Sequence, residues 1–314
     1  MLAIALRRTA MAIPILLGVT VIIFLLMTVL PGDPAAAFIG DDSSKEEIAR
    51  IRSDLGLDDP LPVRYAHWLG DAVSGDLGYS PYRRREVTDL LGQAWVNTAV
   101  LAGCSAVFGL TLGVVLGFAA GVRRGSLTDR LISSFSLTGL SIPSFFLAVL
   151  MLILFSATLN VLPSGGAVLD EGPVEFLRHL LMPMIAGSLA TVAITARVTR
   201  ASIVETYGAD FVQTLRAKGL GTVDTIRHVL KNAISPVLTT SGLQIGYLLG
   251  GSVLVETIFR WPGMGLLVFN AISARDLLVV QGATLVIALT FVLVNLVVDL
   301  MQATIDPRLR RAVG

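Results

Sequence analysis

The stretch ADFVQTLRAKGLGTVDTIRHVLKNAISP, residues 209–236, is a charged interruption between two strongly apolar regions of the chain. Its first part predicts a short helix that starts near Asp210 and has Lys218 in its last turn. The apolar face of this helix carries Phe211, Val212 and Leu215. Gly219 follows, at the position where a glycine in the left-handed conformation ends many helices.

The second part of the stretch predicts an amphipathic helix, with Thr222 as its N-cap and Asp224 near its positive end. The apolar face carries Val223, Ile226, Val229, Leu230, Ala233 and Ile234, and the polar face carries Arg227, His228, Lys231 and Asn232. Pro236 is expected to start the next apolar segment. The two helices form a rigid knob, which suits force transmission to another protein or an interfacial position on anionic lipid.

The composition indicates an all-α integral membrane protein. The 314 residues are 54% hydrophobic and 15% charged, with a mean hydropathy of +0.76, whereas soluble domains carry about 25% charged residues. The net charge of +1 gives no reason to expect nucleic acid as a partner. Six segments are long and apolar enough to be transmembrane helices. They lie near residues 10–30, 97–121, 131–159, 179–196, 237–255 and 281–301.

Basic residues predict the orientation of these spans. They gather at both ends of the chain, in the knob and in one short loop, as Arg7, Arg8, Arg123, Arg124, Arg130, Arg308, Arg310 and Arg311. With six spans, this pattern places both termini in the cytoplasm. The first apolar stretch is longer than a signal-peptide core, so an uncleaved anchor is expected.

Four regions follow from this topology. They are a cytoplasmic N-terminus with the first span (1–30), an extracytoplasmic segment (31–94), a five-helix core that includes the knob region 205–236 (95–303), and a cytoplasmic tail (304–314). The extracytoplasmic segment holds twelve acidic and seven basic residues. Two helices are expected in it, one capped by Ser44 and one around Trp68. The segment would be a cap packed on the bundle or a docking surface for an external partner.

Small residues and prolines mark packing positions within the spans. Gly109, Gly113, Gly117 and Gly121 recur at a spacing of four, which lets helices approach closely. A helix of a partner subunit is one candidate for the facing helix. Pro143 and Pro183 are expected to kink or start helices. The histidines have no metal-ligand spacing with other ligand residues, so no metal site is expected.

Several motifs in order resemble the permeases of ABC importers. The knob sequence is similar to the EAA motif in its dipeptide and oligopeptide form. Around it lie LPGDP (30–34), GDLGYS (75–80), SIPSFF (141–146), LPSGG (162–166), VETIFRWPGMG (255–265) and DPRLR (306–310). Within that family, the chain resembles the B-type permease of dipeptide, oligopeptide, nickel or glutathione importers. One departure is Leu215, where the peptide subgroup has a small residue.

The resemblance implies roles for particular residues. The knob would be the coupling helix that sits in a groove of an ATPase subunit, and its coupling residues would be Asp210, Thr214, Ala217, Lys218, Gly219, Leu220, Arg227 and Asn232. The outer gate, or the docking site of a binding protein, would include Glu256, Trp261, Pro262 and Gly263. Pairing of Glu256 with Arg260 at the headgroup level is the alternative for that carboxylate.

The resemblance also implies the partners of the chain. These are a second homologous permease, two ATP-binding subunits that hold ATP and Mg²⁺, an extracytoplasmic substrate-binding protein and the lipids of the cytoplasmic membrane. The chain has no GxxxxGK[ST] phosphate-binding loop, so it is expected to be a non-enzymatic subunit without a cofactor of its own. Peptides are the expected substrates, with nickel, glutathione or haem as alternatives. An exporter permease and an ion-coupled secondary transporter are the alternatives from other classes.

Overall fold

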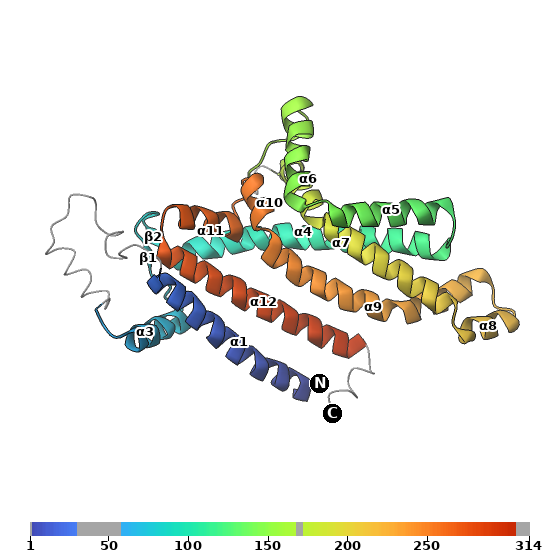
Figure 1. The fold of residues 1–314 in the computed structure, drawn as a ribbon, viewed down its shortest axis with the longest axis horizontal. Helices are drawn as coiled ribbons and strands as arrows, with labels where there is room; N and C mark the ends of the chain where they lie inside the picture. Colours follow the sequence, from blue (N-terminus) through green and yellow to red (C-terminus); the bar gives the residue numbers. More distant parts are fainter. Residues whose placement is uncertain (1, 30–57, 168–171, 306–314) are drawn as a thin grey trace. The chain divides into compact units, whose positions relative to one another are not determined.

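The computed structural model describes residues 2–29, 58–167 and 172–305, and these residues are almost entirely helical (Figure 1). The predicted helix capped by Ser44 lies outside the described residues. Contacts between Cα atoms divide the chain into two compact units. Unit 1 comprises residues 1–5, 99–261 and 294–314, and unit 2 comprises residues 6–98 and 262–293.

Unit 1 is built around the long helix α7. Its elements are the later part of α4 (Val87–Val122), α5 (Leu127–Ser141), α6 (Ser144–Met151), the π-helical η2 (Leu152–Thr158), α7 (Pro173–Tyr207), α8 (Asp210–Ala217), α9 (Thr222–Gly251) and α10 (Val253–Ile258). Helices α5, α6 and α9 all pack on α7. Pro183 lies inside α7 and does not end it, in agreement with the tolerance of membrane helices for proline.

The glycine row of α4 is a packing face, as predicted, and its partner within the described residues is α7 of the same chain. A Cβ atom on Gly113 would lie 2.7 Å from the Thr195 Cβ, and one on Gly117 would lie 2.4 Å from the Ala196 carbonyl oxygen. Real Cβ atoms do not approach other atoms so closely, so only glycine allows this helix separation. The row therefore serves the internal packing of the chain.

The segment expected to form one span near residues 131–159 is broken. Helices α5 and α6 meet at an angle of 98°. Pro143 is the N-cap of α6, and Ile142 before it has an extended backbone. Proline removes a helical hydrogen bond and disfavours the helical conformation of the preceding residue, which explains the break.

Among the residues described, three single helices are long and apolar enough to cross a membrane. They are Val87–Val122, Pro173–Tyr207 and the Leu277–Val298 portion of α12 (Leu277–Ile305), and the bent pair α5–α6/η2 is a fourth if it counts as one span. The apolar part of α1 (Leu2–Val29) is shorter, at Thr9–Leu25. Helices occupy all six predicted regions, but the count of six spans stays a prediction.

Unit 2 contains most of α1, α3 (Leu61–Ser74), the short strands β1 (Tyr79–Ser80) and β2 (Arg85–Glu86), the start of α4, α11 (Met264–Ser273) and the first part of α12. Helix α3 confirms the predicted helix around Trp68. It lies against α1, where Phe24 contacts the rings of Tyr65 and Trp68. The Tyr65 hydroxyl is also 2.8 Å from the Thr20 hydroxyl.

A buried polar contact fixes the β-hairpin to the start of α12. The Ser80 hydroxyl donates to the Asp276 carboxylate, and the Arg83 amide donates to the Ser80 oxygen at 3.0 Å. Ser80 is fully buried and Asp276 is 5% exposed. An apolar core that includes Val87, Leu91 and Val279 surrounds this end of α4 and α12.

Candidate functional site

The knob has the two-helix form that the sequence predicted. Helix α8 spans Asp210–Ala217 and is capped by Lys218, and Gly219 follows with φ +80°. The Gly219 and Leu220 amides donate to the carbonyls of Arg216 and Leu215 at 2.9 and 3.2 Å. Satisfied carbonyls and a left-handed glycine make this a rigid turn.

The second helix differs from the prediction at its N-cap. The N-cap of α9 is Gly221, without a side-chain capping bond, and Thr222 is the first helical residue. Helix α9 also runs without a break through Pro236 to Gly251. Proline lacks only one donor, and membrane helices accommodate the lost bond. The knob therefore continues directly into the following apolar helix.

Apolar packing holds the knob to the ends of α4 and α7. The cluster contains buried Ile203, Val212, Val229 and Ala233, with Phe118, Val122 and Tyr207 packed against it. The Ser202 hydroxyl donates to the Ala233 carbonyl at 2.8 Å and so ties α7 to α9. A displacement of the knob would therefore move α7.

The opposite side of the knob is exposed. Of the predicted coupling residues, Asp210, Thr214, Ala217, Lys218, Gly219, Arg227 and Asn232 are exposed, and Leu220 is half-buried. The predicted apolar stripe of α9 divides in two: Val229 and Ala233 are buried, whereas Val223 and Ile234 are 79% and 48% exposed. The knob thus combines a fixed inner face with an outer face that mixes charged and apolar side chains.

The predicted gate residues are mostly buried. Glu256 and Trp261 are fully buried, Gly263 is buried and Pro262 is exposed. The Ser252 hydroxyl donates to the Glu256 carboxylate at 2.8 Å, whereas Arg260 is exposed and has φ +48°.

Sequence reasoning did not foresee the contact between the LPSGG and VETIFRWPGMG motifs. The Gly166 amide donates to the Phe259 carbonyl at 2.8 Å, and a Cβ atom on Gly165 would lie 2.1 Å from the same oxygen. His179 Nδ1 lies 2.9 Å from the Gly165 carbonyl oxygen, within hydrogen-bond distance. In unit 2, the Asn97 amide group donates to the Pro262 carbonyl at 2.9 Å. The two adjacent glycines at the end of the LPSGG motif were the only sequence signal for such a close approach.

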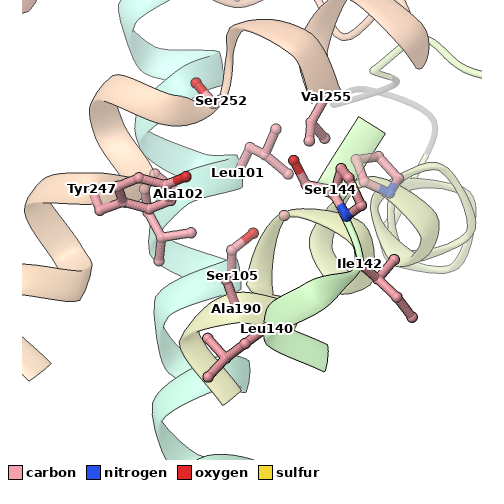
Figure 2. Close-up of a pocket in the computed structure, with 14 residues that line it drawn as sticks. Leu101, Ala102, Ser105, Leu140, Ile142, Ser144, Ala190, Tyr247, Ser252 and Val255 are labelled. Carbon is pink, nitrogen blue, oxygen red and sulfur yellow. The ribbon is translucent and has the colours of Figure 1, made fainter. Parts of the chain in front are cut away.

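A cavity of about 180 Å³ lies at the break between α5 and α6. It is lined by residues of α4, α7, α9 and α10 and by the residues at the break, which are Leu140, Ile142, Pro143 and Ser144. The hydroxyls of Ser105 and Ser144 lie at the cavity (Figure 2). The cavity is lined by apolar side chains and hydroxyls, so it suits a neutral polar group.

A second feature that the sequence analysis missed is the ion pair between Asp129 of α5 and Arg200 of α7. Both residues lie just outside the predicted spans near 131–159 and 179–196, so no local pattern in the sequence signalled the pair. As for metal ligands, no cluster of three or more His, Cys, Asp or Glu side chains occurs in the described part of the chain.

Comparison with known families decides the identity. The family of inner membrane components of binding-protein-dependent transport systems matches residues 113–311, and its N-terminal companion family matches residues 1–104. The chain belongs to this family. The permease is therefore a membrane-spanning subunit of an ABC importer, a class in which separate subunits hydrolyse ATP. This confirms the resemblance read from the motifs and decides against the exporter and secondary-transporter alternatives.

Relatives match the permease over nearly its whole length. A protein of Brucella ovis named as a candidate peptide permease is 40% identical, with 99% of each chain covered. The glutathione transport system permease GsiC of Salmonella typhimurium is 39% identical, also with 99% of each chain covered. An inward-facing structure of the MetNI methionine ABC transporter has a TM-score of 0.54 at 16% identity, covering 69% of the permease and 96% of that chain. This likeness supports the fold alone.

Proposed function

We propose that the knob is the coupling element of the permease and docks on an ATPase subunit. The observation that carries this proposal is the two-sided knob, whose inner face is packed on α4 and α7 and whose outer face is exposed. Closure of two ATPase subunits around ATP and Mg²⁺ would push the knob, and α7 would follow. A second homologous permease would complete the pathway, and an extracytoplasmic binding protein would deliver the substrate.

Cross-linking tests this docking and the orientation together. In a Cys104→Ala background, Lys218→Cys is expected to cross-link to an ATPase subunit in inverted membrane vesicles. Val73→Cys is the control, because Val73 is 82% exposed on α3, in the segment proposed to lie outside. Cross-linking of the ATPase from Val73→Cys would reverse the orientation. Failure of Lys218→Cys in membranes that contain the ATPase would refute the docking.

We propose small peptides as the substrates of the importer. The names of relatives from Brucella and Salmonella support peptides in general and glutathione in particular. Uptake of labelled dialanine and of labelled glutathione, each with the other as competitor, distinguishes these two substrates. Uptake of neither compound by the complete system would contradict both assignments and leave nickel or haem as the candidates.

Glu256 is proposed to act at the outer gate with Trp261, Pro262 and Gly263. A fully buried carboxylate next to the end of the predicted fifth span is costly, which supports a functional role. Glu256→Gln preserves an acceptor for the Ser252 hydroxyl and should lower uptake without loss of the folded protein. Arg260→Gln is the comparison, because equal effects of both variants would show that only the joint charge matters.

A further inference from the structure

The Asp129–Arg200 ion pair joins α5 to α7 with two parallel hydrogen bonds. Arg200 Nε lies 2.5 Å from Asp129 Oδ1, and Arg200 Nη2 lies 2.9 Å from Oδ2. The Asp129 side chain is 6% exposed and that of Arg200 is 34% exposed. A guanidinium that grips both carboxylate oxygens fixes orientation as well as distance. The two helices therefore cannot slide along each other without breaking both bonds.

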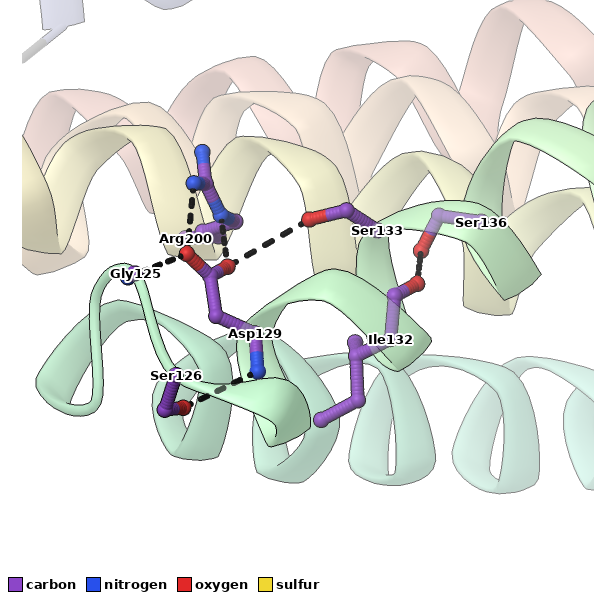
Figure 3. Close-up of polar contacts among 7 residues, drawn as sticks. All are labelled: Gly125, Ser126, Asp129, Ile132, Ser133, Ser136 and Arg200. Atoms are coloured by element: carbon purple, nitrogen blue, oxygen red, sulfur yellow. Dashed lines mark hydrogen bonds and ion pairs between the residues drawn. The ribbon is translucent and has the colours of Figure 1, made fainter.

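Other groups hold the same carboxylate to the start of α5 (Figure 3). The Gly125 amide donates to Asp129 Oδ2 at 2.9 Å, and the Ser133 hydroxyl donates to Oδ1 at 3.4 Å. The Asp129 amide in turn donates to the Ser126 hydroxyl oxygen at 3.2 Å. The carboxylate is thus fixed in position by α5 and the turn before it, and Arg200 of α7 binds this fixed group.

Stability alone gives little reason for this pair. Desolvation of the buried Asp129 carboxylate and the half-buried Arg200 guanidinium offsets much of their attraction, and apolar replacements of such pairs are often neutral or stabilising. Asp129 lies in the first turn of α5 and Arg200 near the end of α7, just outside the predicted spans near 131–159 and 179–196. The pair therefore fixes the ends of these two helices relative to each other.

The pair occupies the end of α7 that leads to the knob. Arg200 lies seven residues before the end of α7 at Tyr207, and α8 begins at Asp210. From Asp129, α5 runs along α7 in the opposite direction, and a Cβ on Gly139 would lie 3.4 Å from the Ala193 Cβ. It then ends at the bend before Pro143, which lines the cavity. Helix α5 therefore connects the knob end of α7 to the bend.

We propose that the Asp129–Arg200 ion pair makes α5 follow α7 when the knob moves, and so transmits that motion to the α5–α6 bend beside the cavity. The inference rests on the proposed role of the knob. Asp129 and Arg200 are positioning residues, because they act through the helices that they join. Loss of the pair would let α7 move while the bend stays in place.

The test follows the bend directly and needs no known substrate. The complex with its partner subunits is placed in nanodiscs, with Cys104→Ala to remove the only native cysteine of the chain and Ser144→Cys as a reporter at the bend. The rate of maleimide labelling is measured with and without ATP and vanadate, which trap the ATPases. We expect trapping to change the labelling rate, and Asp129→Asn to reduce that change about tenfold, within the usual range of coupling between sites.

Two further variants separate transmission from folding. Arg200→Lys keeps the charge but loses the two-pronged grip, and it should retain only part of the ATP-dependent change. Arg197→Lys is the matched control, because Arg197 is exposed one turn earlier on α7. It should behave as the reference protein, which carries only Cys104→Ala and Ser144→Cys. If Asp129→Asn does not assemble, the comparison of these two lysine variants decides.

Each outcome has a distinct meaning. A full ATP-dependent change in Asp129→Asn, or in Arg200→Lys if the former does not assemble, overturns the proposed link. A reference protein whose labelling does not respond to ATP overturns the motion of the bend altogether. If no ATPase copurifies with the reference protein, the proposed function of the knob fails instead. A merely structural pair would lower the yield or melting temperature of the complex and leave the ATP response intact.

Discussion

Replacement of Gly219 by alanine should weaken coupling through backbone strain alone. Gly219 has φ +80°, and a Cβ atom added there would meet nothing within 4 Å. Alanine therefore adds no clash, and its cost is that of the left-handed conformation, about 1–2 kcal/mol. This corresponds to a fall of about 5- to 30-fold in the equilibrium between the native turn and relaxed alternatives. The buried contacts of Val212 and Val229 should keep the rest of the knob folded.

The assay is ATP-driven uptake by the complex in proteoliposomes, with Gly221→Ala as the matched control. Gly221 has φ −66°, which any residue adopts, and it also has open space around it. Gly219→Ala should lower uptake, and Gly219→Asn should lower it less because asparagine tolerates this conformation. Gly219→Asp should insert but fail to couple, because it adds a negative charge to the exposed face that is proposed to dock. Equal uptake by Gly219→Ala and Gly221→Ala would refute the reasoning.

Three other substitutions test the packing of the permease. Gly117→Ala should destabilise the purified protein by about 1–3 kcal/mol through overpacking and so lower its melting temperature. Gly103→Ala is the control and should leave the melting temperature unchanged, because Gly103 lies on the same helix with open space around it. Equal melting temperatures of the two variants would contradict the close approach. Ser80→Ala leaves the buried Asp276 carboxylate without its hydroxyl donor, so the hairpin at 79–86 should be cleaved faster in limited proteolysis, and unchanged cleavage would argue against this anchor. Gly187→Leu should fill the cavity and lower uptake without loss of ATPase binding, and normal uptake would exclude a role for the cavity in transport.

Local signals in the sequence predicted the knob well. The order of Asp210, Lys218 and Gly219 defined the first helix and its left-handed end, and the structure confirms both. Pro236, which was expected to start the next apolar segment, lies inside one continuous helix, because a proline there removes only one hydrogen bond. At Pro143 the same residue type does break the helix. The surroundings of the two prolines, rather than the residue itself, decide the outcome.

Contacts between distant segments were harder to predict. The glycine row of α4 predicted a close approach but could not name α7 of the same chain as its partner. The Asp129–Arg200 pair joins residues that lie far apart in the sequence, and no local period links them. The approach of Gly165 to Phe259 has the same character. Such contacts depend on the packing of whole helices, which a single sequence does not specify residue by residue.

Purification of the tagged permease from detergent-solubilised membranes tests the central claim most directly. The membranes must contain the partner subunits, and ATPase activity is assayed on the eluate. The account predicts that a second permease and ATPase subunits co-elute with activity, and that the Gly219→Asp variant loses this activity. A permease that elutes alone and inactive would contradict the coupling role and make the knob a helix on the lipid surface.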